Sequence, residues 1–87
     1  MRIARALADA TRFGILRAIT EAGEISCGDL AAKFPIAQPT VSHHVKVLVD
    51  CGLVNARKDG QHSIFSAQPA ALDAYRGALG HLGALAP

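Results

Sequence analysis

The stretch that decides the fold is Ala-Gln-Pro-Thr-Val-Ser-His-His-Val-Lys-Val-Leu, residues 37–48. Its apolar side chains, together with the next valine, recur at the i, i+4, i+7 and i+8 spacing of one helix face: Val41, Val45, Leu48 and Val49. The other face carries hydrogen-bonding groups and one cation, with no carboxylate before Asp50: Gln38, Thr40, Ser42, His43 and Lys46. Such a face suits a polyanion with readable donor and acceptor edges, which describes the major groove of DNA.

A second helix signal lies directly upstream of this stretch. Residues 26–29, Ser-Cys-Gly-Asp, match a capping box, with serine at the N-cap and an acid three residues later. The pattern predicts a short helix through Phe34, which the following proline ends. The next three residues form a turn, and the helix of residues 38–51 ends at Gly52. Two helices joined by so short a turn make a helix-turn-helix unit.

Two further helices are expected before this unit. A short helix is expected over residues 2–8, and a longer one over residues 10–22, with Asp9 as its N-cap and Gly23 as its terminating residue. The next two residues are expected to form a brief extended link. The longer helix has an apolar face to bury: Phe13, Ile15, Leu16, Ala18 and Ile19.

A β-hairpin is predicted after the helix-turn-helix unit. Two strand-like runs, residues 53–58 and 61–66, are separated by Asp-Gly, and this dipeptide favours a type I′ turn. A two-stranded ribbon in this place is a wing, and its tip would expose four polar residues: Arg57, Lys58, Gln61 and His62. A last helix over residues 69–85 carries apolar residues at helical spacing: Leu72, Tyr75, Leu79 and Leu82.

These elements predict a mainly α fold with a small β-hairpin, a winged helix-turn-helix of about five helices and a two-stranded wing. One domain over residues 1–87 is expected from the length. No apolar run approaches the roughly 20 residues of a transmembrane helix. Two cysteines and no signal-peptide pattern indicate a cytoplasmic protein with reduced thiols. No enzyme is expected, because there is no Ser-His-Asp arrangement, no carboxylate pair in a plausible cleft and no phosphate loop. No catalytic residue or cofactor is therefore assigned.

Several motifs resemble one family of regulators. Residues 7–16 read Leu-Ala-Asp-Ala-Thr-Arg-Phe-Gly-Ile-Leu, and residues 29–31, 38–48 and 51–54 continue the same pattern. Over roughly residues 3–66 the chain resembles the arsenic-repressor-type (ArsR/SmtB) winged-helix transcriptional regulators. The resemblance implies a homodimer whose two recognition helices read the halves of a DNA operator. It also implies an interface between the first and last helices: Ile3, Leu7, Leu72, Tyr75, Leu79 and Leu82.

The metal sites of that family are not expected here. Many members sense metals through a Cys-x-Cys pair, and the corresponding residues in this chain are Ser26, Cys27 and Gly28. A single thiolate cannot build the site of two or three thiolates that a soft metal requires. Another subgroup binds zinc through Asp, His and Glu of paired last helices, whereas this last helix offers Asp73 and His81 alone. No metal ligand is therefore assigned, and the effector stays unknown.

The residues expected to contact DNA come from the recognition helix and the wing. Glutamine and histidine suit base edges, threonine and serine suit phosphates, and a lysine further along the helix suits the DNA backbone. The wing cations suit phosphates or the minor groove, although the net charge of +2 is mild. The full set is Gln38, Thr40, Ser42, His43, Lys46, Arg57, Lys58 and Gln61.

Two alternatives to this interpretation stay open. Cys27 lies in the first turn of a predicted helix, where the helix dipole favours negative charge, so a metal- or thiol-responsive repressor on the same scaffold is one of them. The other is a protein-interaction module that uses the winged-helix fold without DNA. Cys51 is expected to serve as a small buried residue, and His44, which borders the apolar stripe, is expected to act inside the domain.

Overall fold

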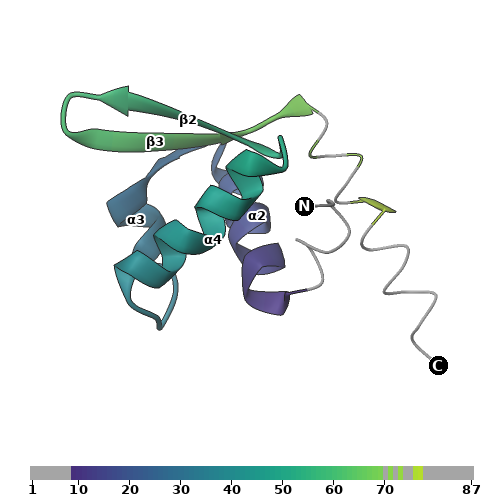
Figure 1. The fold of residues 1–87 in the computed structure, drawn as a ribbon, viewed down its shortest axis with the longest axis horizontal. Coiled ribbons are helices and arrows are strands. Elements are labelled where there is room, and N and C mark those ends of the chain that lie inside the picture. Colours follow the sequence, from purple (N-terminus) through teal and green to yellow (C-terminus); the bar gives the residue numbers. More distant parts are fainter. Residues whose placement is uncertain (1–8, 70, 72, 74–75, 78–87) are drawn as a thin grey trace.

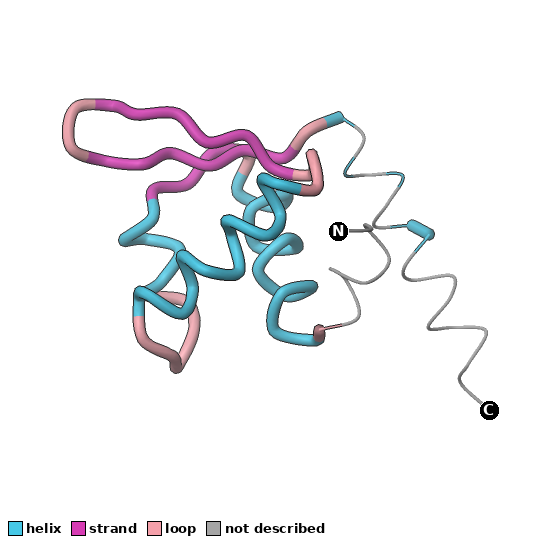
Figure 2. Tube along the Cα trace, viewed as in Figure 1, coloured by secondary structure: helices cyan, strands magenta, loops and turns pink. Residues whose placement is uncertain are grey.

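The computed structural model describes residues 9–69, 71, 73, 76 and 77. Within them, three helices and three strands follow one another in the order α2-β1-α3-α4-β2-β3, and Figures 1 and 2 show the helices gathered below a long β-hairpin. The strands form one antiparallel sheet in the order β1-β3-β2. The elements are α2 (Ala10–Ala22), β1 (Glu24–Ser26), α3 (Cys27–Ala31), α4 (Gln38–Asp50), β2 (Val54–Asp59) and β3 (His62–Ala67).

The count of about five helices and a two-stranded wing is wrong for this described part of the chain. Residues 24 and 25, predicted as an extended link, belong to the strand β1, which also includes Ser26 and pairs with β3 through Ile25 and Phe65 at its centre. A strand of three residues is too short to show a clear alternation, and its partner lies far along the sequence. The helix predicted over residues 2–8 lies outside the described residues. Of the last predicted helix, residues 69, 71, 73, 76 and 77 are described, and all are helical.

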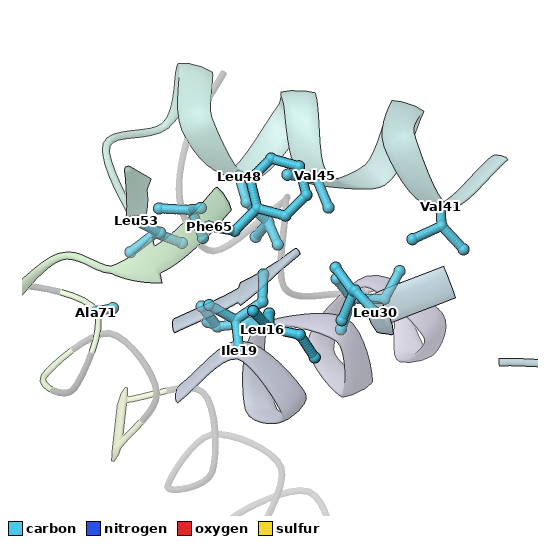
Figure 3. Packing of buried hydrophobic residues seen from close by; sticks show 12 residues of the cluster. Leu16, Ile19, Leu30, Val41, Val45, Leu48, Leu53, Phe65 and Ala71 are labelled. Atoms are coloured by element: carbon cyan, nitrogen blue, oxygen red, sulfur yellow. The ribbon is translucent and has the colours of Figure 1, made fainter. Parts of the chain in front are cut away.

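The core lies between the three helices and the sheet. The predicted stripe of α4 is confirmed at Val41, Val45 and Leu48, which are at most 2% exposed. Val49 is only partly buried, whereas Val47 is buried as well. Figure 3 shows side chains from the helices and the sheet pointing into one cluster. Besides Val41, Val45 and Leu48, the cluster includes Ile15, Leu16, Ile19, Ile25, Leu30, Leu53, Val54, Phe65 and Ala71.

The predicted caps are confirmed at both ends of α2 and at the start of α3. The Asp9 carboxylate accepts the Arg12 backbone N–H at 3.0 Å, and the Ser26 hydroxyl accepts the Asp29 N–H at 3.1 Å. Gly23 has a φ of 79°, where a side chain would be strained, and it donates its N–H to Ile19 at 3.1 Å. The helix α3 ends at Ala31, three residues before the predicted end.

The turn of the wing is one residue further along than predicted. Asp59 pairs with His62, so the two loop residues are Gly60 and Gln61. Gly60 has a φ of 63°, and no described non-glycine residue has a positive φ. A positive φ at the first loop position alone is the sign pattern of a type II′ turn, which takes glycine there, and not of the predicted type I′ turn. Both strands therefore begin one residue later than predicted.

Candidate nucleic-acid interface

The polar face of α4 is largely open to solvent. Gln38, Thr40, His43 and Lys46 are exposed, and Ser42 is partly buried. The N-cap residue Ala37 offers no side-chain acceptor to the first turn, so the amide end of α4 has no capping side chain. A helix N-terminus in this state favours negatively charged groups. The apolar stripe on the opposite side fixes the direction of this face by packing into the core.

A thiol from α3 contacts two of the predicted DNA-facing side chains. Cys27 Sγ lies 3.4 Å from Ser42 Oγ, and the Gln38 side-chain amide donates a hydrogen bond to the same sulfur at 3.7 Å. This contact was missed by sequence reasoning, because the three residues belong to different helical turns and no local pattern connects them. The sulfur of Cys27 thus orients the side chains of Gln38 and Ser42 on the polar face.

The neighbouring histidines of α4 point to different surroundings. Arg12 of α2 donates through Nε to Nδ1 of His44 at 3.3 Å, and this contact is partly buried. His44 therefore holds α4 against α2, as expected for a residue inside the domain. His43 is exposed, and its ring centroid is 6.0 Å from that of His44 with the planes tilted by 59°. Of the pair, His43 alone is available on the polar face.

The Arg12 contact is continuous with the N-cap of α2. The hydrogen bond from the Arg12 backbone N–H lowers the pKa of the Asp9 carboxyl, and the positive charge of Arg12 acts in the same direction, while burial opposes this shift. Two hydrogen bonds therefore connect α4 to the first turn of α2: Arg12 bonds to Asp9 through its backbone N–H and to His44 of α4 through its side chain.

The wing has one face toward α4 and one face away from it. Ala56 and Phe65 line a shallow groove of about 230 Å³ against four residues of α4: Ser42, Val45, Lys46 and Val49. Because side chains alternate along a strand, Lys58 lies on the same face as Ala56. Lys46 and Lys58 therefore both lie on the side where the helix and the wing meet. Gln61 is exposed in the turn.

Arg57 lies on the other face of the wing. Its guanidinium forms an exposed ion pair with Glu24 of β1, with Nη2 3.2 Å from Oε2. Of the eight predicted DNA contacts, Arg57 is thus engaged elsewhere, on the face of the wing that points away from α4. The pairing was not foreseen, because β1 itself was not predicted.

Other predicted sites fall partly outside the described residues. This holds for all six predicted interface residues: Ile3, Leu7, Leu72, Tyr75, Leu79 and Leu82. In the part of the chain that the structure describes, no three His, Cys, Asp or Glu side chains are grouped closely enough to hold a metal. No described helix is long and apolar enough to cross a membrane.

The chain is similar to known repressors. A family model described as "Helix-turn-helix domain" matches residues 7–57. The arsenical resistance operon repressor of Staphylococcus aureus is 42% identical over 71 residues, which are 82% of this chain and 67% of that repressor. A Streptomyces lividans protein, "Probable mercury resistance operon repressor", is 45% identical over 75% of this chain, and the match spans 51% of that relative.

The fold is also found among solved structures. A crystal structure described as "Possible transcriptional regulator for arsenical resistance" superposes with a TM-score of 0.81 at 29% sequence identity. The similarity covers 94% of this chain and 84% of that one. It includes α4 and the wing, the two elements that carry the polar groups described above.

Proposed function

Because the chain belongs to the arsenic-repressor-type (ArsR/SmtB) family of winged helix-turn-helix transcriptional regulators, we propose that it is a sequence-specific DNA-binding repressor. The observation that carries the proposal is the exposed polar face of α4, which has no carboxylate before Asp50 and is fixed by a buried apolar stripe. Because the helix is already held in place, its backbone does not have to be ordered when this face enters a groove.

The chemistry of the side chains supports different contacts for different residues, some with base edges and others with phosphates. Gln38 and His43 have donors and acceptors for base edges in the major groove. Thr40 and Ser42 suit phosphate oxygens near the amide end of the helix. The lysines on the α4 side of the wing and helix, Lys46 and Lys58, suit the phosphate backbone, and Gln61 suits the groove beside it.

The proposal includes a homodimer of single-domain chains acting in the cytoplasm, where the DNA partner is. A chain of 87 residues buries a modest core, and domains of this size are often stabilised by association. The apolar residues expected at the ends of the chain suit such an interface: Ile3, Leu7, Leu72, Tyr75, Leu79 and Leu82. A dimer would fix the distance between two α4 helices and so select operators with matching half-site spacing.

Selection of bound duplexes from a random library tests the proposal. We expect enrichment of a palindrome, with both half-sites protected. The variants Gln38→Ala and His43→Ala should relax the base preference at distinct positions, whereas Arg17→Gln, on an exposed part of α2, should not. If no sequence is enriched and the Gln38 and His43 variants behave as the wild type, the chain is a protein-interaction module instead.

A second candidate is a metal- or thiol-responsive form of the same repressor. The contact of Cys27 with Gln38 and Ser42 favours it, because a change at this sulfur would reach the polar face of α4 directly. Any effector must bind the DNA-competent and incompetent states with different affinities. Titration of zinc, cadmium or arsenite while the affinity for the selected duplex is followed separates the candidates, since an unresponsive affinity argues for another kind of effector.

A further inference from the structure

The ion pair between Glu24 and Arg57 connects the two outer strands of the sheet. The guanidinium approaches both carboxylate oxygens of Glu24: Nη2 lies 3.3 Å from Oε1 and 3.2 Å from Oε2, and Nε lies 3.4 Å from Oε2. Because the strand order is β1-β3-β2, this contact reaches across the central strand. It joins the wing to the segment between α2 and α3.

The position of Arg57 along the wing is the second observation. Arg57 pairs with Ile64 of β3, and Ile64 pairs in turn with Ser26, the last residue of β1. Toward the tip, the sheet continues as two strands alone, and Figure 1 shows this hairpin projecting beyond the helices. A two-stranded ribbon in water is only marginally stable by itself. Arg57 therefore lies at the boundary between the supported and unsupported parts of the wing.

The direction of the side chain is the third observation. Arg57 and Lys58 are adjacent, so they lie on opposite faces of β2. Lys58 shares its face with Ala56, which lines the groove against α4, and Arg57 lies on the face of Glu24. The two wing cations, which look equivalent in the sequence, therefore have different surroundings.

We propose that Arg57 is a positioning residue of the wing, fastened by Glu24, and that it does not itself contact DNA phosphate. The ion pair fixes the hairpin at Arg57, where its two-stranded part begins, so that Lys58 and Gln61 are held beside α4. This inference rests on the proposed DNA binding. Exposed ion pairs contribute little, so the expected loss of DNA affinity in Arg57→Gln is about two- to fivefold.

Exchange of the two charges tests the proposal. The duplex selected from the random library is the probe, and the proteins are Arg57→Glu, Glu24→Arg and the double variant. Arg57→Glu should weaken binding, and the double variant should restore it to within about twofold, since the exchanged pair can form again. The net charge at this place is unchanged in the double variant, so a bulk electrostatic effect is controlled. A double variant as weak as Arg57→Glu would overturn the proposal, because it would mean that a cation is needed at position 57 itself.

The salt dependence of binding gives an independent test. A lost phosphate contact reduces the slope of log K against log salt by about 0.9. We expect this reduction for Lys58→Gln and an unchanged slope for Arg57→Gln. A reduced slope in Arg57→Gln, or tighter binding with a steeper slope in Glu24→Gln, would show that phosphate and Glu24 compete for Arg57, and would overturn the proposal.

Amide hydrogen exchange in the free protein tests the fastening without DNA. Arg57→Gln should speed exchange in the wing beyond residue 57 while the amides of α2 and α4 stay protected. Arg17→Gln breaks another exposed ion pair, with Glu21, and should leave wing exchange unchanged. Unaltered wing exchange in Arg57→Gln would refute the fastening role. This measurement is valid even if the library yields no DNA sequence, so failure of the inference and failure of the proposed function can be told apart.

Discussion

Cys27 Sγ and Ser42 Oγ lie 3.4 Å apart, so the first residue of α3 touches the middle of the polar face of α4. The same sulfur accepts a hydrogen bond from the Gln38 side-chain amide, one helical turn before Ser42. The two helices of the helix-turn-helix unit are therefore joined by a polar contact as well as by apolar packing. Sulfur is a weak donor and acceptor, so the contact orients side chains more than it stabilises the fold.

Modification of Cys27 is expected to weaken DNA binding. A carboxamidomethyl group on this sulfur would occupy the space between Gln38 and Ser42 and displace both side chains. We expect a loss of affinity for the selected duplex on the order of tenfold, equivalent to about 1.4 kcal/mol. Binding titrations with iodoacetamide-treated protein, in a Cys51→Ser background, measure the effect.

The control for this experiment is Cys27→Ser in the same background. It keeps a small polar group at the position, so its affinity should stay close to that of the wild type and should not respond to the reagent. A fully modified Cys27 protein with wild-type affinity would mean that the polar face tolerates the added group.

Substitutions of the two adjacent histidines are expected to have different effects: His44 should matter for stability and His43 for DNA affinity. Removal of the His44 ring leaves the partly buried Arg12 contact unmade, and His44→Ala should lower the free energy of unfolding by about 1 kcal/mol. His43 is exposed, so His43→Ala should change stability by less than about 0.5 kcal/mol. The affinity for the selected duplex should fall by at least about fivefold in His43→Ala if a base-edge contact is lost.

Urea denaturation and DNA titration of both variants check this pair of outcomes. Each histidine serves as the control of the other, because the two are neighbours in sequence and identical in chemistry. Lower stability in His43→Ala together with unchanged stability in His44→Ala would reverse the assignment of the two rings.

The sequence predicted the elements whose signals are local. The burial of Val41, Val45 and Leu48 follows from spacing along one helix, and the bounds of α2 follow from the cap at Asp9 and the glycine at 23. In each case the deciding residues lie within a few positions of one another, so periodicity and cap chemistry are sufficient.

The features that were missed depend on contacts between distant segments. The strand β1 forms because residues 24–26 pair with β3, which is distant in the sequence. The ion pair between Glu24 and Arg57 depends on this strand pairing. The contact of Cys27 with Ser42 likewise depends on how α3 packs on α4. The wing turn was misplaced by one residue, because Asp59-Gly60 and Gly60-Gln61 both satisfy a glycine-containing hairpin and the register is decided by pairing across the strands.

The N-cap of α2 predicts a dependence of stability on pH. The pKa of Asp9 is lower in the folded protein than in the unfolded chain, chiefly because the Arg12 N–H bonds to the carboxylate. Its contribution is therefore fully present above the unfolded-state pKa and is lost as the pH falls through the folded-state pKa. Asp9→Ala should cost about 1 kcal/mol near neutral pH, and the difference from the wild type should shrink below about pH 4.

Thermal or urea unfolding across this pH range measures the difference. Asp9→Asn is the matched control, since asparagine caps helices without a titrating charge. Its loss near neutral pH should be smaller than that of Asp9→Ala, and the difference in stability between these two variants should not change with pH. A constant difference between wild type and Asp9→Ala from neutral to acidic pH would contradict the role of the ionised carboxylate.

The turn of the wing predicts an effect of Gly60→Ala on both stability and binding. Gly60 has a φ of 63°, so any side chain there is strained even though a Cβ would meet nothing within 4 Å. We expect a cost of about 1–2 kcal/mol, seen in urea denaturation or as local opening of the hairpin by hydrogen exchange. Because Gln61 and Lys58 lie at or next to this turn, DNA affinity should fall even at temperatures where the protein is fully folded.

Gly28→Ala is the control, because Gly28 lies in α3 without a positive φ and with open space around its Cβ position. Alanine there should leave stability unchanged or raise it by up to about 1 kcal/mol, as expected for glycine replacement in a helix. A Gly60→Ala protein that keeps both wild-type stability and wild-type DNA affinity would mean that the hairpin accepts another turn without loss.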